Sequence, residues 1–299
     1  MLRELVDARV PILAGTEIES ALASRCGDKL DPRLDGAGLL GAEPGREALR
    51  ALYAEHVDVA WLHGLPAVVG TPTFRASRRH VERARCGGEA VRRLNAEAVA
   101  LVDEVRAAGE HEPVFVAGVV GPHGDPYQPG DALAYRAGAE YHAEQVAALV
   151  DAGVDLLVAR TFPSIEEAHG AAIAMSTAGL PYAVDFVLDD RGRLLDRTYL
   201  HAAITRIDEC VVPEPAYYSA SCLHPAVART ALNNLFVSSS SAAARLREVK
   251  ANAADAPEAF GAAMHRLGRD FEIPILGGCR GASAQHLTAL ARRLEARAA

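Results

Sequence analysis

The stretch YHAEQVAALVDAGVDLLVARTFPSIEEA, residues 141–168, decides the fold. Its first half carries Val146 and Leu149 at a spacing that places them on one face of a helix, and Gly153 then ends that helix. The apolar run that follows predicts a buried strand over Asp155–Thr161. A helix that leads directly into a buried strand is the repeating element of an α/β protein with a parallel sheet.

The same alternation of short apolar runs and Ala-rich helical segments continues along the chain. Strands are expected at Pro11–Ala14, Ala67–Val69, Val114–Val120, Asp155–Thr161, Tyr182–Leu188, Tyr217–Cys222, Leu235–Ser238 and Ile273–Gly277. Helices are expected at Gly45–Tyr53, Gly88–Ala108, Ala132–Ala152, Ser164–Ala178, Thr198–Ile207, Pro225–Asn233, Ala256–Leu267 and Ala284–Ala298. Strand–helix units without a breaking linker predict a single (β/α)8 barrel of the TIM type over residues 1–299. A doubly wound sheet is the alternative, but no GxGxxG follows the first strand.

The bulk composition is that of an ordinary soluble globular protein. The 299 residues carry a net charge of −8, a pI near 5.8 and a mean hydropathy of +0.05. This acidic balance argues against nucleic acid or an anionic membrane as the main partner and favours a small-molecule substrate. No apolar run is long enough for a membrane span, and charges near Met1 argue against a signal peptide. The five scattered cysteines then predict reduced thiols in a cytoplasmic protein, which could also form an oligomer.

In a barrel of this kind the reacting groups lie where the strands end and the following loops begin. Two of the five cysteines, Cys222 and Cys279, fall at the ends of the expected sixth and eighth strands. Thiols that converge from separate strands are how a metal site or a nucleophile site is built. The polar and charged candidates at these ends are Thr16, Glu17, Thr73, His123, Arg160, Asp185, Cys222, His224, Cys279 and Arg280.

Six segments in the expected order resemble the homocysteine S-methyltransferase family, the zinc-thiolate barrels that methylate homocysteine. The resemblance covers most of the chain. The segments are AGTEIE (14–19), TPTFRAS (71–77), VAGVVGPHG (116–124), the opening stretch (141–168), SASCLHP (219–225) and LGGCRGASAQHLTAL (276–290).

The resemblance implies a zinc ion held by three cysteines, one after strand six and an adjacent pair after strand eight. Cys222 and Cys279 match two of these positions, whereas Arg280 stands at the third. His224 or His123 would then complete a Cys2His set, although both are also ordinary loop histidines. A cation beside Zn²⁺ is repelled and cannot coordinate it, so Arg280 argues against zinc.

The resemblance also implies carboxylates that hold the amino group of homocysteine, at positions where this chain has Ala14 and Arg160. The planar guanidinium of Arg160 suits a carboxylate, sulfonate or phosphate, or else an internal ion pair with Asp185 or Glu17. If it faces the substrate, the substrate is acidic. The residues expected to bind substrate are Thr16, Glu17, Thr73, Arg160 and Asp185.

A methyl-accepting thiol must lose its proton near neutral pH, although the pKa of a free thiol is about 8.5. Zinc achieves this by direct coordination. Without zinc, Arg280 would lower the pKa of Cys279 or of a bound thiol, so Cys279 and Arg280 are the predicted catalytic residues. The alternative is that Cys279 is a small buried residue at a Gly-Gly turn.

Three functions follow from these residues. The first is methyl transfer to the thiol of a small, anionic substrate by a divergent member of the family, with Zn²⁺ as a candidate cofactor. The second is a zinc-free barrel that acts as a lyase or hydrolase on an anionic molecule held by Arg160 and Arg280. The third is a non-catalytic binding subunit. The sequence carries no motif that identifies the methyl donor.

Overall fold

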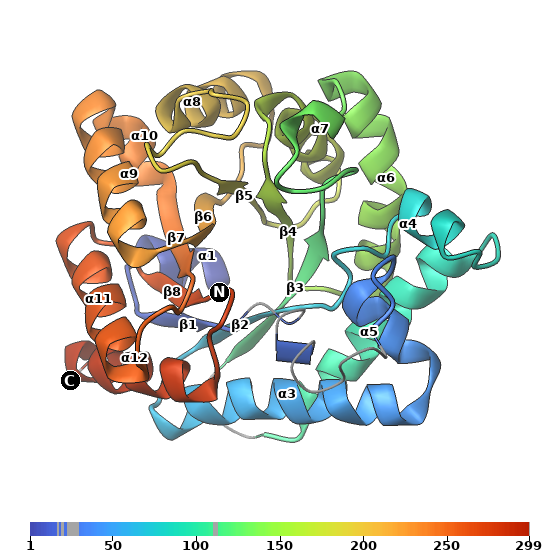
Figure 1. The fold of residues 1–299 in the computed structure, drawn as a ribbon, viewed down its shortest axis with the longest axis horizontal. Coiled ribbons are helices and arrows are strands. Elements are labelled where there is room, and N and C mark those ends of the chain that lie inside the picture. The colour runs from blue at the N-terminus through green and yellow to red at the C-terminus, as the bar shows by residue number, and fades with distance from the viewer. Residues whose placement is uncertain (17, 19–20, 23–29, 110–112, 299) are drawn as a thin grey trace.

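The computed structural model describes residues 1–16, 18, 21–22, 30–109 and 113–298. Its eight parallel strands pair in chain order and close into a barrel, with the helices on the outside (Figure 1). The strands are β1 (Ile12–Ala14), β2 (Ala67–Gly70), β3 (Val114–Val120), β4 (Leu156–Phe162), β5 (Tyr182–Val187), β6 (Tyr217–Leu223), β7 (Leu246–Ala251) and β8 (Ile275–Gly278). The predicted (β/α)8 fold is confirmed.

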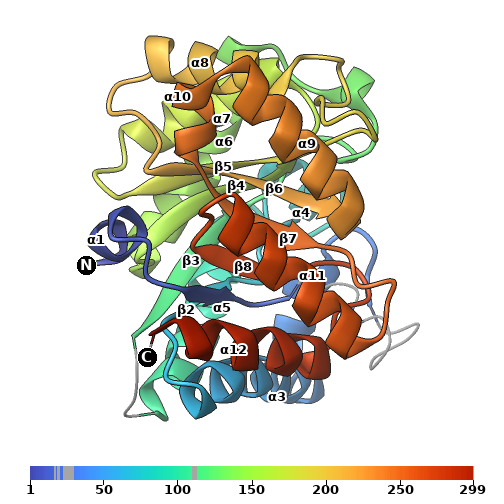
Figure 2. The ribbon, with the colours of Figure 1, turned by 90° about the vertical axis from the view of Figure 1, so that its left-hand side faces the viewer.

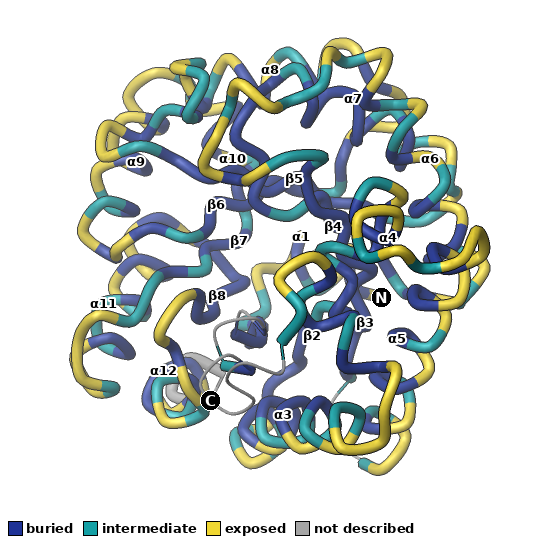
Figure 3. Tube along the Cα trace, turned by 45° about the vertical axis from the view of Figure 1, so that its right-hand side comes forward, coloured by how far each residue is buried: buried dark blue, intermediate teal, exposed yellow. Residues whose placement is uncertain are grey.

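The helices form a ring whose inner faces are buried and whose outer faces are exposed (Figure 3). The α-helices are α1 (Leu2–Asp7), α3 (Glu43–Leu62), α4 (Arg78–Arg83), α5 (Ala90–Ala107), α6 (Tyr135–Ala152), α7 (Ile165–Ser176), α8 (Leu200–Cys210), α9 (Pro225–Ser238), α10 (Ser240–Arg245), α11 (Pro257–Asp270) and α12 (Ala284–Ala298). Within the described residues, the 3₁₀ helices η2 (Asp35–Gly41) and η3 (Pro129–Asp131) lie in the loops after β1 and β3. No described helix is long and apolar enough to cross a membrane.

Apolar side chains fill one end of the barrel interior. Leu2 and Val6 of α1 pack there against Ile12, Phe115 and Ile275. Figure 2 shows α1 lying across this end, where the strands begin. The polar side chains that point into the barrel are therefore confined to the other end, where the strands finish.

The expected seventh strand is wrong. Leu235–Ser238 forms the last turn of α9, and the seventh strand is Leu246–Ala251. Pro225 starts that helix, where its missing N–H costs nothing, and the chain stays helical through Leu235–Ser238. Val237 is 89% exposed, so its apolar side chain is not evidence of a buried strand.

The sequence of β7, LREVKA, contains three charged residues and so lacks the apolar run that marks the other strands. Val249 faces the core shared with the helices, while Glu248 and Lys250 alternate with it and point into the barrel. Charges in the barrel interior thus hide this strand from a search for apolar segments. They also place two ionisable groups in the candidate site.

Candidate functional site

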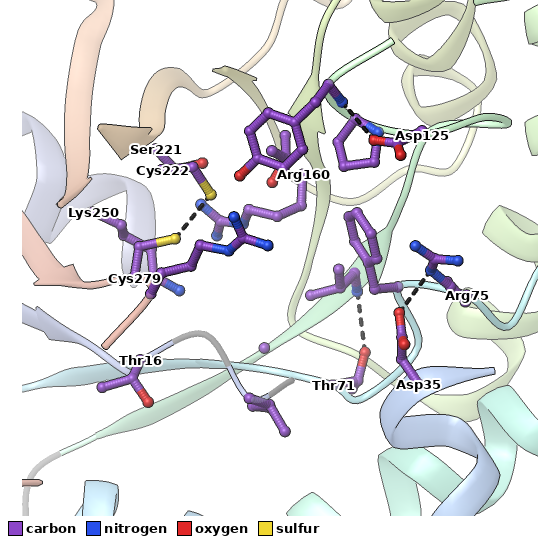
Figure 4. A pocket seen from close by; sticks show the side chains of 18 of the residues that line it. Thr16, Asp35, Thr71, Arg75, Asp125, Arg160, Ser221, Cys222, Lys250 and Cys279 are labelled. Atoms are coloured by element: carbon purple, nitrogen blue, oxygen red, sulfur yellow. Dashed lines mark hydrogen bonds and ion pairs between the residues drawn. The ribbon is translucent and has the colours of Figure 1, made fainter. Parts of the chain in front are cut away.

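A cavity of about 380 Å³ opens at the carboxyl ends of the strands. Five of the expected residues line it, and they come from the ends of β1, β4, β6 and β8: Thr16, Arg160, Cys222, Cys279 and Arg280. Figure 4 shows the two cysteines on one side of this cavity together with Arg160 and Lys250. The structure therefore brings together the thiols and cations that the sequence places far apart.

The two cysteines meet at the mouth of the barrel, where the Sγ atoms of Cys222 and Cys279 lie 2.8 Å apart (Figure 4). Cys222 has a left-handed backbone, with φ = 60°, at an irregularity in the pairing of β6 with β7. Such a conformation is disfavoured for a residue with a side chain, and it recurs at functional sites. Cys279 is 3% exposed and donates its backbone N–H to the carbonyl of Ala251 at 2.7 Å.

The two glycines before Cys279 are required by close packing. A Cβ at Gly277 would lie 2.5 Å from the carbonyl oxygen of Ala14 on β1, and one at Gly278 would lie 2.3 Å from the Cβ of Ala282. Without side chains, β8 can pair closely with β1 and the chain can turn back over its own end. This turn holds the thiol of Cys279 at the cavity wall.

The expected third zinc ligand is not supplied by either histidine. The Nδ1 of His224 accepts the N–H of Ala226, and its Nε2 lies 3.5 Å from a carboxylate oxygen of Asp255. The Nδ1 of His123 lies 2.9 Å from Nη1 of Arg79. Neither histidine lines the cavity.

Within the described residues, no three His, Cys, Asp or Glu side chains are grouped so that they could hold a metal ion. The residues present do not fit the three-ligand zinc site that the resemblance implies.

Arg280 extends instead over an aromatic ring. Its guanidinium carbon lies 5.2 Å from the ring centre of Tyr127, which belongs to the loop between β3 and α6. Burial raises the pKa of Tyr127, and the nearby Cys222 raises it further. Arg280 has no acidic partner among the residues that the structure describes, so its charge remains available at the rim.

Arg160 lies over two fully buried carboxylates. Its Nη1 is 3.1 Å from Glu248 and 3.6 Å from Asp185. Asp185 also accepts the N–H of Thr161 at 2.7 Å and the hydroxyl of Ser221 at 2.5 Å. Burial raises the pKa of Asp185 despite Arg160, whereas Glu248 and Asp185 outweigh the effect of burial on Arg160 and raise its pKa. The ion pair with Asp185 is one of the two alternatives that the sequence left open.

The remaining expected residues lie around this cavity or beneath it. Thr16 bonds to His56 at 2.9 Å and lines the cavity, whereas Asp185 lies below the lining. Thr73 is fully buried, donates to the carbonyl of Val119 at 2.6 Å and bonds to the cavity residue Thr71. Glu17 falls outside the described residues.

Sequence reasoning missed Glu248 and Lys250 because it placed the seventh strand elsewhere. The alternation of Glu248 and Lys250 with the apolar Val249 in LREVKA is the signal that could have found them. It also missed Tyr127, which lies in a Gly- and Pro-rich loop with no pattern of its own. Lys250 lines the cavity, and burial lowers its pKa, as does the nearby Arg160.

The comparisons with known proteins agree with the barrel fold and give its family. The family model described as homocysteine S-methyltransferase matches residues 14–294. The oxidized form of the Escherichia coli homocysteine methyltransferase MmuM superposes with a TM-score of 0.80 at 23% identity, covering 98% of this chain and 99% of that one. Its metallated form gives the same TM-score at 22% identity and the same coverage. No curated protein sequence matches the chain. Since the family model spans nearly the whole barrel, the chain belongs to the homocysteine S-methyltransferase family.

Proposed function

We propose that the protein transfers a methyl group to the thiol of a small anionic molecule bound in the cavity at the barrel mouth. The observation that carries this proposal is the meeting of Cys222 and Cys279 within a wall that also presents Arg160, Lys250 and Arg280. Family membership supports transfer to a thiol. The cations support an acidic acceptor, since an anion gains attraction from each of them.

In the proposed reaction the sulfur of the acceptor thiol attacks the methyl carbon of the donor. The bond between that carbon and the donor breaks, and the donor leaves with the bonding electron pair. The acceptor must first lose its proton, which passes to solvent through the cavity mouth. The guanidinium of Arg280 has no acidic partner among the described residues, so it favours the thiolate form of a thiol bound beside Cys279.

The part of the acceptor that Arg160 contacts is expected to differ in charge from the ammonium group of homocysteine. Arg160 stands where the resemblance implies a carboxylate for the ammonium group. An ammonium placed there would meet a cation, whereas a carboxylate would meet a guanidinium with matching geometry. The proposal therefore keeps the family's class of reaction and changes the charge of the substrate.

The test is a methyl-transfer assay with a panel of thiols and of sulfonium and folate-type methyl donors, with the thioether product identified by mass spectrometry. We expect a thioether from an acidic thiol, and a rate at least about tenfold lower in Cys279→Ser and in Arg280→Met, which is the loss of one stabilising contact of about 1.4 kcal/mol. Cys210→Ser is the matched control, because Cys210 is exposed at the end of α8 and does not line the cavity. Absence of thioether from every acidic thiol in the panel would refute the proposal.

The same preparation decides the question of zinc. We expect less than one equivalent of zinc in protein grown in zinc-replete medium and purified without chelator. One equivalent of zinc that is lost in both Cys222→Ser and Cys279→Ser would show that a third ligand completes the site, contrary to the fit described above.

A further inference from the structure

Lys250 presents an ammonium group to the cavity without a counter-charge of its own. It lies at the end of β7 and lines the cavity, and no hydrogen bond or ion pair joins it to any residue that the structure describes. Its nearest carboxylate in the sequence, Glu248, is held by Arg160 at 3.1 Å. A cation withdrawn from bulk water without a partner is costly, so this position favours a ligand that supplies the missing negative charge.

Arg160 also presents hydrogen-bond donors, its Nε and Nη2 groups, to the cavity that Lys250 lines. Its contacts with protein run from Nη1 to Glu248 and Asp185, and its side chain is 12% exposed. No hydrogen bond from Nε or Nη2 reaches a described residue, and neither atom is among the buried polar atoms that lack a partner. These N–H groups therefore face the cavity solvent. A guanidinium edge with two parallel N–H groups is suited to a planar carboxylate.

The two cations lie beside the thiol pair. In the barrel Lys250 is aligned with Ser221 on β6 and with Gly277 on β8, one residue before Cys222 and two before Cys279. Neighbouring strands are about 4.8 Å apart, so a group bound at Lys250 is only a few bonds from either sulfur. Figure 4 shows Lys250 and the two cysteines on one side of the cavity with Arg160 beside them, and Asp35 and Arg75 on the opposite side.

We propose that Arg160 and Lys250 form a carboxylate subsite that selects mercaptocarboxylates without an ammonium group next to the carboxylate. This inference rests on the proposed function for the role of the thiol, but the subsite itself is independent of methyl transfer. An α-ammonium group would be brought within several ångströms of both cations. Lys250 is the cation that no described carboxylate pairs with, and its repulsion of that ammonium group over about 5 Å, at an effective dielectric constant near 20, corresponds to a preference of about 100-fold or more for the ligand that lacks it.

The first experiment measures binding without chemistry. Isothermal titration calorimetry with butyrate, butylamine and butanol compares three ligands of similar size that differ in charge. We expect butyrate to bind at least about 100-fold more tightly than butylamine, and at least about tenfold more tightly than butanol.

Variants then assign the effect to the subsite. Lys250→Met should weaken butyrate binding at least about tenfold, whereas Lys250→Arg should retain it, because only the former removes the charge. Arg75→Met is the matched control, since it removes one cation from the opposite wall of the same cavity, where Arg75 pairs with Asp35. Equal weakening by Lys250→Met and Arg75→Met would show a general effect of charge and overturn the subsite.

The second experiment measures methyl transfer to mercaptopropionate, homocysteine and mercaptoethanol. In Lys250→Met we expect the KM for mercaptopropionate to rise about tenfold or more while the KM for uncharged mercaptoethanol is unchanged. If methyl transfer occurs but homocysteine is used as well as mercaptopropionate, the subsite is wrong and the proposed function stands. If butyrate binds through Lys250 but no thiol is methylated, the subsite stands and the proposed function fails.

Discussion

Arg160→Met removes the cation that neutralises two fully buried carboxylates. In the native protein its Nη1 lies 3.1 Å from Glu248 and 3.6 Å from Asp185, and both acids are 0% exposed. Removing one partner of a buried ion pair leaves a buried charge without compensation, which costs about 3–5 kcal/mol. In a domain of this size we expect a fall in Tm on the order of 10 °C.

The loss of stability should depend on pH in a direction fixed by the acids. Burial already raises the pKa of Asp185 above 3.8, and without Arg160 it rises further. A carboxyl whose pKa is higher in the folded than in the unfolded protein favours folding at low pH, and this contribution is lost as the pH rises through the folded pKa. The difference between Arg160→Met and the native protein is therefore expected to be largest near pH 8 and to shrink towards pH 5.

Urea unfolding at several pH values measures this difference directly. The double variant Arg160→Met with Glu248→Gln should recover part of the loss, because it removes one of the two charges. Arg229→Met, which breaks the partly exposed pair with Asp270, is the matched control and should cost less than about 1 kcal/mol. A loss below about 1 kcal/mol for Arg160→Met at pH 8, or one that grows as the pH falls, would refute the reasoning.

Burial holds the pKa of His80 near 4, so the native protein should lose about 3 kcal/mol of stability as the pH falls from 6.5 to 4, and His80→Gln should flatten this profile in urea unfolding. Cys222→Gly should be more stable than Cys222→Ala by about 1 kcal/mol in thermal unfolding, because φ at this position is 60°. In Glu167→Ala, the backbone N–H groups of His123 and Leu133 and the Nε2 of His142 lose the carboxylate that they contact. Limited proteolysis should then cut residues 121–133 faster than in the native protein. Val237→Glu should change stability by less than about 0.5 kcal/mol, whereas Val249→Glu should prevent folding as judged by circular dichroism; equal effects would contradict the assignment of β7.

The sequence was sufficient for the fold wherever burial dictates an apolar pattern. The seven correctly expected strands all face the shared core of strands and helices, so their residues repeat a recognisable apolar run. The eighth case, β7, failed because two of its residues, Glu248 and Lys250, point into the polar end of the barrel. The seventh strand was misplaced for a physical reason. The hydropathy pattern of a strand reflects both of its faces, and the face of β7 that points into the barrel carries charges.

The candidate site was predictable in part of its membership and not in its geometry. The strand ends identified Cys222, Cys279 and Arg160 as neighbours of one cavity. The left-handed backbone at Cys222 and the reach of Tyr127 across the mouth depend on tertiary packing, because nothing local to a cysteine or a loop tyrosine requires them. Asp185 was expected as a partner of Arg160, but its second partner, Glu248, could not be found as long as that residue was not assigned to a strand.

The arrangement of charge within the barrel explains how substrate preference can change while the reacting position is kept. Asp185 and Glu248 lie fully buried beneath the cavity, and Arg160 and Lys250 lie above them at its surface. The lower anions keep Arg160 charged, and the fold needs that charge to neutralise them. Because Arg160 is paired with the two buried acids in this way, one substitution cannot reverse its charge without lowering the stability of the fold. A thiol does not neutralise a buried carboxylate, so a substitution at Cys222 or Cys279 leaves in place the charge of Arg160 that Asp185 and Glu248 require.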